Sequence, residues 1–107
     1  MSEVRAHLFI SGSVHGVFFR EHLKNWAEME GVNGWVRNLS DGRVEAVLEG
    51  FSERVERVIE LCRAGPPLGR VKNVGVSAEA FQGIMGFEIR KDGQFFTQKK
   101  AENEDRL

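Results

Sequence analysis

Residues 12–20, which read G-S-V-H-G-V-F-F-R, hold the residue types of this chain that are best suited to bind an anion. They follow an alternating apolar run and precede a segment with helical periodicity, so we expect a turn between a strand and a helix. Gly12 and Gly16 let the backbone curl with its amides pointing inward. The helix start adds the positive end of its dipole, and Arg20 adds a permanent charge with a planar fork of donors. The stretch therefore predicts a cradle for a phosphate-sized dianion.

A second candidate, Asn38, lies at the end of another predicted strand. Its amide side chain has a donor and an acceptor, so it suits the task of holding one water molecule beside the anion. Both candidates also allow a structural interpretation, because glycine-containing strand-turn-helix units occur where nothing binds and Asn38 would serve as an ordinary residue near a hairpin. Against the structural interpretation of Arg20, a helix start is an unfavourable place for a cation unless an anion lies there.

The string G-x-V-x-G-V-F-F-R, followed by Gly34-Trp35-Val36-Arg37-Asn38, resembles the acylphosphatase family. The resemblance runs from about Val4 to Arg90. It implies a ferredoxin-like fold and hydrolysis of the carboxyl-phosphate bond of acyl phosphates to a carboxylate and inorganic phosphate. It also implies that Arg20 binds the phosphate and that Asn38 orients the attacking water. The backbone amides that would complete the cradle belong to His15, Gly16, Val17, Phe18 and Phe19.

Two positions depart from the family pattern. His15 stands where Gln is usual, and its imidazole would add pH dependence if it faced the anion, although its backbone amide serves as any other would. Leu39 stands where Thr or a similar residue is usual, which removes a hydroxyl behind Asn38 that Ser40 would have to replace.

The predicted chemistry requires little from the protein besides positioning. An acyl phosphate releases a carboxylate whose conjugate acid has a pKa of about 4 to 5, so the leaving group needs no proton. Positioned donors neutralise the phosphoryl oxygens, and one water must be aimed at phosphorus. Because Asn38 is not basic, we expect the proton to pass from the water to a phosphate oxygen. The interpretation includes no metal and no cofactor, and its partners are a small acyl phosphate and inorganic phosphate, which is both product and inhibitor.

Composition supports a single globular domain. The chain has 107 residues, 41% hydrophobic and 29% charged, with a net charge of −1, which disfavours a protein that coats nucleic acid or acidic membranes. Its only cysteine, Cys62, cannot form an internal disulfide. The N-terminus shows no signal peptide or long apolar span, so the expected location is cytoplasmic. We expect residues 1–91 to form the acylphosphatase-like domain and residues 92–107 to be a charged C-terminal extension.

Periodicity outlines the elements that must position the candidates. Residues 4–10 alternate as a strand with one buried face, and helical spacing begins at Phe19 and ends at Gly31. Residues 32–39 form a second strand, and residues 40–42 form the tight turn of a hairpin.

A third strand follows from Val44, and Ser52 is suited to cap a second helix, which residues 65–67 end. Residues 70–81 read as a fourth strand with a bulge between Val71 and Val74, and Phe87 and Ile89 mark a short fifth strand. The order predicts an α+β ferredoxin-like βαββαβ sandwich, with an antiparallel sheet, two helices on one face and a short extra C-terminal strand.

Two other functions fit this fold class. A non-catalytic RNA-binding module would use aromatic residues on the sheet, and residues 7–10 loosely match its first motif, but residues 43–50 offer no aromatic and the chain has no basic surplus. A second alternative is a non-catalytic phosphate sensor, which would use the cradle for binding alone, or a domain like the acyl-phosphate-handling N-terminal part of hydrogenase maturation proteins. We expect neither nucleic acid nor membrane as a partner and treat the chain as a free-standing enzyme. Phe95 and Phe96 would either stay in a solvated tail or dock on the sheet or on a second subunit.

Overall fold

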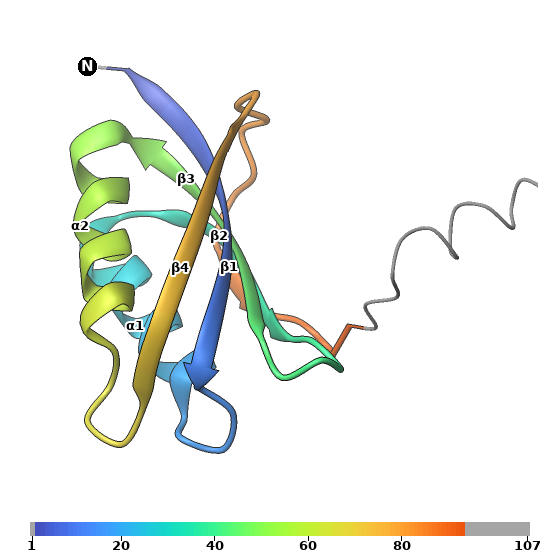
Figure 1. Cartoon of the computed structure of the whole chain (residues 1–107). Coiled ribbons are helices and arrows are strands. Elements are labelled where there is room, and N and C mark those ends of the chain that lie inside the picture. The colour runs from blue at the N-terminus through green and yellow to red at the C-terminus, as the bar shows by residue number, and fades with distance from the viewer. Residues whose placement is uncertain (1, 94–107) are drawn as a thin grey trace, which may run out of the picture.

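The computed structural model describes residues 2–93, which form one mixed sheet with both helices on the same face (Figure 1). The strand order is β4-β1-β3-β2-β5. None of the helices in this part of the chain is long and apolar enough to cross a membrane. In chain order, the elements are β1 (Glu3–Ser13), α1 (Phe19–Glu30), β2 (Asn33–Asn38), β3 (Val44–Phe51), α2 (Ser52–Ala64), β4 (Arg70–Glu79) and β5 (Phe87–Ile89).

The predicted ferredoxin-like βαββαβ order is confirmed. Strands β1, β2, β3 and β4 pair in antiparallel fashion, with β1 and β3 at the centre. The fifth strand differs from the expectation of an antiparallel sheet, because β5 runs parallel to β2. The chain leaves β4 at one edge and returns at the opposite edge, so residues 80–86 must span the sheet between them.

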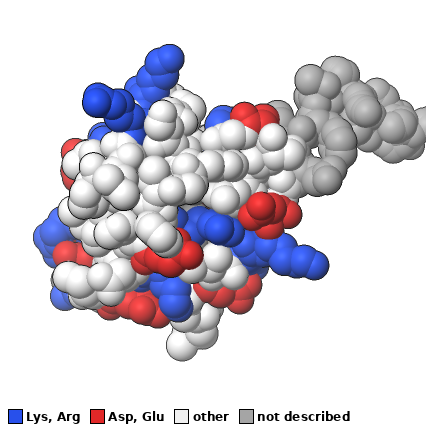
Figure 2. Space-filling view, turned by 90° about the horizontal axis from the view of Figure 1, so that it is seen from below, with Lys and Arg blue, Asp and Glu red and all other residues white. Residues whose placement is uncertain are grey.

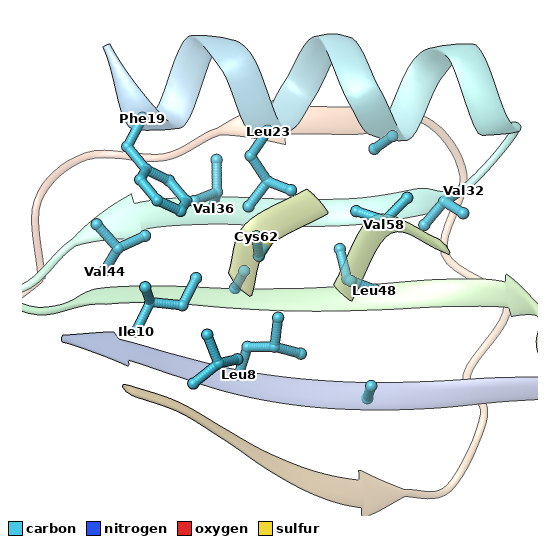
Figure 3. Close-up of a cluster of buried hydrophobic side chains, with 14 of the residues drawn as sticks. Leu8, Ile10, Phe19, Leu23, Val32, Val36, Val44, Leu48, Val58 and Cys62 are labelled. Carbon is cyan, nitrogen blue, oxygen red and sulfur yellow. The ribbon is translucent and has the colours of Figure 1, made fainter. Parts of the chain in front are cut away.

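The hydrophobic core lies between the sheet and the two helices (Figure 3). Its sheet side consists of alternate residues of the central strands, such as Leu8, Ile10 and Leu48, which are fully buried. Its helix side comes from stripes spaced by three and four residues, as predicted. Full burial of each large aliphatic side chain contributes about 1.5–3 kcal/mol. The helix residues buried in this core are Phe19, Leu23, Ala27, Val55, Val58 and Cys62.

The predicted helix ends are confirmed, but one predicted cap is wrong. Helix α1 stops before Gly31, which adopts a positive φ of 71°, and α2 stops before Gly65. Ser52 does not cap α2, since it is already the first helical residue and Phe51 holds the N-cap position without a side-chain hydrogen bond. The reason is that β3 runs directly into α2, so the N-cap position falls on the last residue of the strand. The backbone amide of Ser52 donates to the Ser2 carbonyl.

The bulge predicted between Val71 and Val74 is confirmed in β4, opposite the end of β1. The pairing of β1 with β4 shifts between Ser11 and Gly12, which face Asn73 and Val71. Gly12 has a φ of 132°, and a Cβ there would lie 2.1 Å from the Arg70 carbonyl oxygen. A glycine is therefore required at the point where β1 turns toward residues 14–18.

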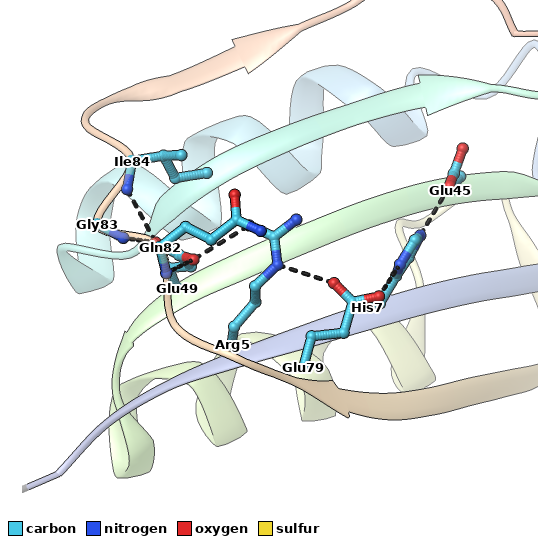
Figure 4. Close-up of polar contacts among 8 residues, drawn as sticks. All are labelled: Arg5, His7, Glu45, Glu49, Glu79, Gln82, Gly83 and Ile84. Atoms are coloured by element: carbon cyan, nitrogen blue, oxygen red, sulfur yellow. Dashed lines mark hydrogen bonds and ion pairs between the residues drawn. The ribbon is translucent and has the colours of Figure 1, made fainter.

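A buried carboxylate joins the sheet to the segment that spans it (Figure 4). Glu49 of β3 has no exposed surface, and it accepts hydrogen bonds from the amides of Gln82, Gly83 and Ile84 at 2.8–2.9 Å. Arg5 of β1 contacts the same carboxylate at 3.1 Å. Burial by itself raises the pKa of Glu49, but these amide bonds and Arg5 outweigh it, so its pKa lies below the usual value.

We expect Glu49→Gln to lower the free energy of unfolding by about 2–4 kcal/mol at pH 7, because an amide group cannot accept all four bonds and leaves buried donors unpaired. Since the folded pKa is lowered, the carboxylate stabilises the protein fully above the unfolded pKa of about 4.3 and less as pH falls through the folded value. Urea unfolding at pH 7 and at pH 3 measures both effects.

The matched control for this prediction is Glu88→Gln, which removes an exposed carboxylate paired with Arg90. We expect that change to cost no more than about 0.5 kcal/mol. A difference between the two variants of under 1 kcal/mol at pH 7, or one that grows in acid, would contradict the role of Glu49.

Candidate active site

Both candidate side chains lie at one pocket, of about 220 Å³, at the end of the molecule where β1 passes into α1. Arg20 reaches it from the first turn of α1, and Asn38 reaches it from the last position of β2. Their separation in sequence is bridged by β3, which pairs with both β1 and β2. The full lining is Val14, Gly16, Phe18, Phe19, Arg20, Glu21 and Asn38.

The loop of residues 14–18 has the backbone of an anion nest. Gly16 has a φ of 71°, and Phe18 has a φ of 61°, which makes it the single non-glycine residue with positive φ within residues 2–93. Left-handed geometry at a bulky residue is costly and is typical of functional sites. Within the same residues, none of the five amides of the predicted cradle donates a hydrogen bond to another protein group. The donors of this loop are therefore available to a ligand.

The loop is held at both ends by buried side chains. Val14 is 1% exposed and Phe19 is 2% exposed, and both belong to the core. The Phe19 ring also meets Trp26 edge-on at 6.3 Å. Between these anchors Phe18 is 65% exposed at the pocket rim. The positive φ of Phe18 keeps its side chain out of the core and leaves its position at the helix N-cap without a side-chain cap, so the helix start is open.

The guanidinium of Arg20 is partly exposed and already has one partner. Its Nη1 donates to Oδ1 of Asp92 at 3.2 Å, and within residues 2–93 it has no second protein partner. Because an arginine fork has five N–H donors, most of them remain for an anion in the pocket.

The side chain of Asn38 makes no hydrogen bond within the described part of the chain. Its backbone is fixed, however, because its carbonyl accepts from the Gly93 amide at 2.7 Å and its Cα pairs with Val44. A fixed backbone with a free amide side chain is what a water-binding group needs.

The two departures from the family pattern serve other contacts. The His15 imidazole makes a 2.9 Å contact, through Nε2, with the backbone carbonyl of Arg43, and His15 does not line the pocket. The same carbonyl accepts from the Leu39 amide at 2.8 Å. His15 therefore ties the loop of residues 14–18 to the turn of the β2–β3 hairpin. Leu39 is 2% exposed, so its side chain packs in the interior behind Asn38.

Charges at this end of the molecule are mixed. Figure 2 shows it from below, with basic and acidic side chains next to one another and no continuous basic surface on the face in view. Within residues 2–93, no group of three or more His, Cys, Asp or Glu residues is placed to hold a metal ion. Cys62 lies in the core, and burial raises its pKa to about 12, so its thiol is inert.

The structure brings most of the predicted site residues together. Gly16, Phe18, Phe19, Arg20 and Asn38 line the pocket, whereas His15 and Val17 do not. Sequence reasoning missed Val14, Glu21 and Asp92.

The signals for these three residues differ. Val14 and Glu21 lie next to the predicted cradle in sequence, so proximity could have indicated them. Asp92 contacts Arg20 across 72 positions, and it falls in the segment that we expected to be a charged extension. Residues 94–107 of that extension, with Phe95 and Phe96, lie outside the described residues.

Comparisons with known proteins agree with one another. The family model Acylphosphatase matches residues 6–89. An acylphosphatase of Haloarcula marismortui is 49% identical over 90 residues, which cover 84% of this chain and 99% of the relative. The structure of an acylphosphatase from Coxiella burnetii has a TM-score of 0.80 and 38% identity, and the match covers 82% of this chain and 93% of that one.

One structural relative is much longer. HypF of T. kodakarensis is 32% identical with a TM-score of 0.72, and the match covers 84% of this chain but 12% of HypF. A domain of this kind thus also occurs inside a larger protein. The Haloarcula and Coxiella proteins, in contrast, are matched over almost their whole length. With the family model matched over most of the chain and a relative at nearly half identity, this chain belongs to the acylphosphatase family.

Proposed function

We propose that Arg20 and the open amides of residues 15–19 bind the phosphoryl group of an acyl phosphate, and that Asn38 orients the water that hydrolyses it. Membership of the family makes the chain an enzyme of acyl phosphate hydrolysis. The observation that supports these residue roles is the single pocket shared by Arg20, Asn38 and the open loop.

Binding rests on donors that need no rearrangement. Within residues 2–93, amides at a helix start and most N–H groups of a guanidinium have no protein partner, so they present several donors to one dianion. Because the loop is anchored by Val14 and Phe19, its donors are oriented before the substrate arrives. Such preorganised dipoles stabilise charge in the transition state, when the phosphoryl oxygens carry most of it.

The reaction needs one more element, a water molecule in line with the leaving carboxylate. The Asn38 amide can accept a hydrogen bond from this water and donate one to a phosphoryl oxygen. As water attacks phosphorus, the bond to the carboxylate oxygen breaks, and the water proton passes to a phosphate oxygen. The products are a carboxylate and inorganic phosphate, and the phosphate can rebind in the cradle as an inhibitor.

The RNA-binding alternative has less support. In such modules a base stacks on exposed aromatic faces of the sheet. Here the Phe9 ring already stacks on His7 at 5.0 Å, and the Arg43 guanidinium lies 4.7 Å from its centre. Cytoplasmic location remains a prediction, supported by a single buried cysteine.

We predict that Arg20→Ala lowers kcat/KM for benzoyl phosphate by at least about a hundredfold and abolishes inhibition by phosphate. The reason is that the transition state and the complex with inorganic phosphate both lose the charge of the guanidinium. Asn38→Ala should lower kcat by about a hundredfold while the inhibition constant for phosphate changes little, because water orientation matters only in the reaction. Steady-state kinetics with and without phosphate separate the two outcomes.

Matched controls exist for both substitutions. Arg63 on α2 pairs with Glu60, and Asn25 on α1 lies away from the pocket. Their alanine variants should retain wild-type kinetics. If Asn38→Ala weakens phosphate binding as strongly as Arg20→Ala, the proposed division of roles is wrong.

We also predict that turnover survives removal of metal. Protein treated with EDTA and passed through a desalting column should hydrolyse benzoyl phosphate at the untreated rate, because protein donors supply the charge that a metal would. Loss of activity that Mg²⁺ or Zn²⁺ restores would overturn this part of the proposal.

The tie between His15 and the hairpin yields a further prediction. His15→Ala should lower kcat/KM by about three- to tenfold, because the loop loses its tie to the Arg43 carbonyl, which also binds the Leu39 amide next to Asn38. His15→Gln retains an N–H donor and should stay close to wild type. The control His22→Gln alters a ring that faces Trp26 instead. Equal kinetics for the Ala and Gln variants of His15 would show that the tie has no role.

A further inference from the structure

The geometry points to Asp92 and Gly93, which follow β5, as a clamp that positions the two site residues: Asp92 holds the side chain of Arg20, and Gly93 holds the backbone of Asn38. This inference rests on the proposed roles of Arg20 and Asn38. It assigns a positioning function to residues beyond the segment that matches the family model, which ends at residue 89.

The first half of the clamp is the ion pair between Asp92 and Arg20. Its single contact, Nη1 to Oδ1 at 3.2 Å, occupies one corner of the guanidinium. Without a carboxylate, a cation in the first turn of α1 is repelled by the positive end of the helix dipole and is free to swing into solvent. The pair offsets that repulsion and leaves the remaining N–H donors of Arg20 for a phosphoryl group.

Asp92 is placed outside the anion space. Arg20 lines the pocket, but Asp92 does not, and its side chain is 67% exposed. A carboxylate that competed with phosphate would have to lie among the lining residues. Asp92 instead contacts the guanidinium of Arg20 from outside the pocket, where it can restrain this group without occupying the anion site.

The second half of the clamp is backbone pairing with the end of β2. The Gly93 amide donates to the Asn38 carbonyl at 2.7 Å, and the Gly93 carbonyl accepts from the Ser40 amide at 2.9 Å. Upstream, the Arg90 amide donates to the Val36 carbonyl at 2.8 Å. Asp92 therefore lies between two anchored residues, and Figure 1 shows this segment running beside the β2–β3 turn.

The surroundings of Gly93 fix the clamp further. A Cβ at Gly93 would lie 2.6–2.8 Å from the Arg37 guanidinium, so the side chain of Arg37 covers this residue closely. Arg37 is itself held by Glu45 at 2.7 Å and lies over the Trp35 ring at 5.4 Å. The clamp is thus attached to the outer face of the sheet as well as to the site.

Substitution of Asp92 in the full-length protein tests the first half. We expect Asp92→Asn to raise KM for benzoyl phosphate and the inhibition constant for phosphate by about three- to tenfold, with a smaller change in kcat, because the lost restraint acts on the binding arginine. Asp92→Glu should recover most of the loss. The control Glu88→Gln removes a neighbouring exposed carboxylate that pairs with Arg90, and it should leave both constants unchanged.

Three outcomes decide against Asp92 as a positioning residue. A lower inhibition constant in Asp92→Asn would make it a competitor of phosphate, and constants equal to those of Glu88→Gln would leave it without a role. The third readout is independent of catalysis: the Nε–Hε signal of Arg20 in ¹⁵N NMR should shift in Asp92→Asn. An unchanged signal would overturn the ion pair even if the protein bound no phosphate, whereas a shifted signal without phosphate binding would count against the proposed function alone.

Two variants of Gly93 test the second half. Both Gly93→Ala and Gly93→Pro displace the Arg37 side chain, but only proline removes the N–H group that bonds to Asn38. We expect kcat to fall by about three- to tenfold more in Gly93→Pro than in Gly93→Ala. Gly75→Ala is the control for adding a methyl group to a strand glycine, since its Cβ would meet only the Phe9 carbonyl at 3.8 Å. Equal kcat values for the Ala and Pro variants would exclude a role for the Gly93 hydrogen bond.

Discussion

The candidate site depends on the main-chain amides of residues 15–19, which donate no hydrogen bond to another group within residues 2–93. Backbone donors in proteins are nearly always paired, so an open loop next to an open helix start is a constraint that surrounding elements must enforce. Here Gly12, which lies opposite the β4 bulge, directs the chain into the loop, and Val14 and Phe19 fix the two ends of the loop in the core. The left-handed conformation of Phe18 keeps the helix start uncapped. The conformation of this loop is locally unfavourable, and the packing of its two ends in the core holds it in place.

Carboxylates on the outer face of the sheet and at the pocket differ in how completely they are paired. On the outer face of the sheet, Glu49 is fully buried and fully paired, and its lowered pKa reflects a carboxylate whose charge is satisfied inside the protein. His7 likewise lies between Glu45 and Glu79, at 2.7 and 2.6 Å (Figure 4). At the pocket, Asp92 satisfies only one corner of Arg20. Complete pairing stabilises the fold, whereas incomplete pairing keeps a charge available to a ligand.

HypF shows a fold of this kind in another protein context. A similar fold occurs there as part of a much longer chain. Asp92 and Gly93 lie just beyond the matched family segment, yet they contact both Arg20 and Asn38. Sequence that follows the matched segment can therefore contact candidate site residues when it pairs with the end of β2.

Local physics let the sequence alone determine the element order, the helix ends at Gly31 and Gly65 and the bulge in β4, because periodicity and glycine geometry act within a few residues. The same locality predicted an anion cradle at residues 12–20, and amide chemistry together with the family resemblance predicted the role of Asn38. The pairing of Asp92 with Arg20, the burial of Glu49 and the parallel direction of β5 were decided only by the tertiary structure. Each of these depends on which distant segments the sheet brings together, and an exposed-looking aspartate or an alternating glutamate carries no local sign of its partner.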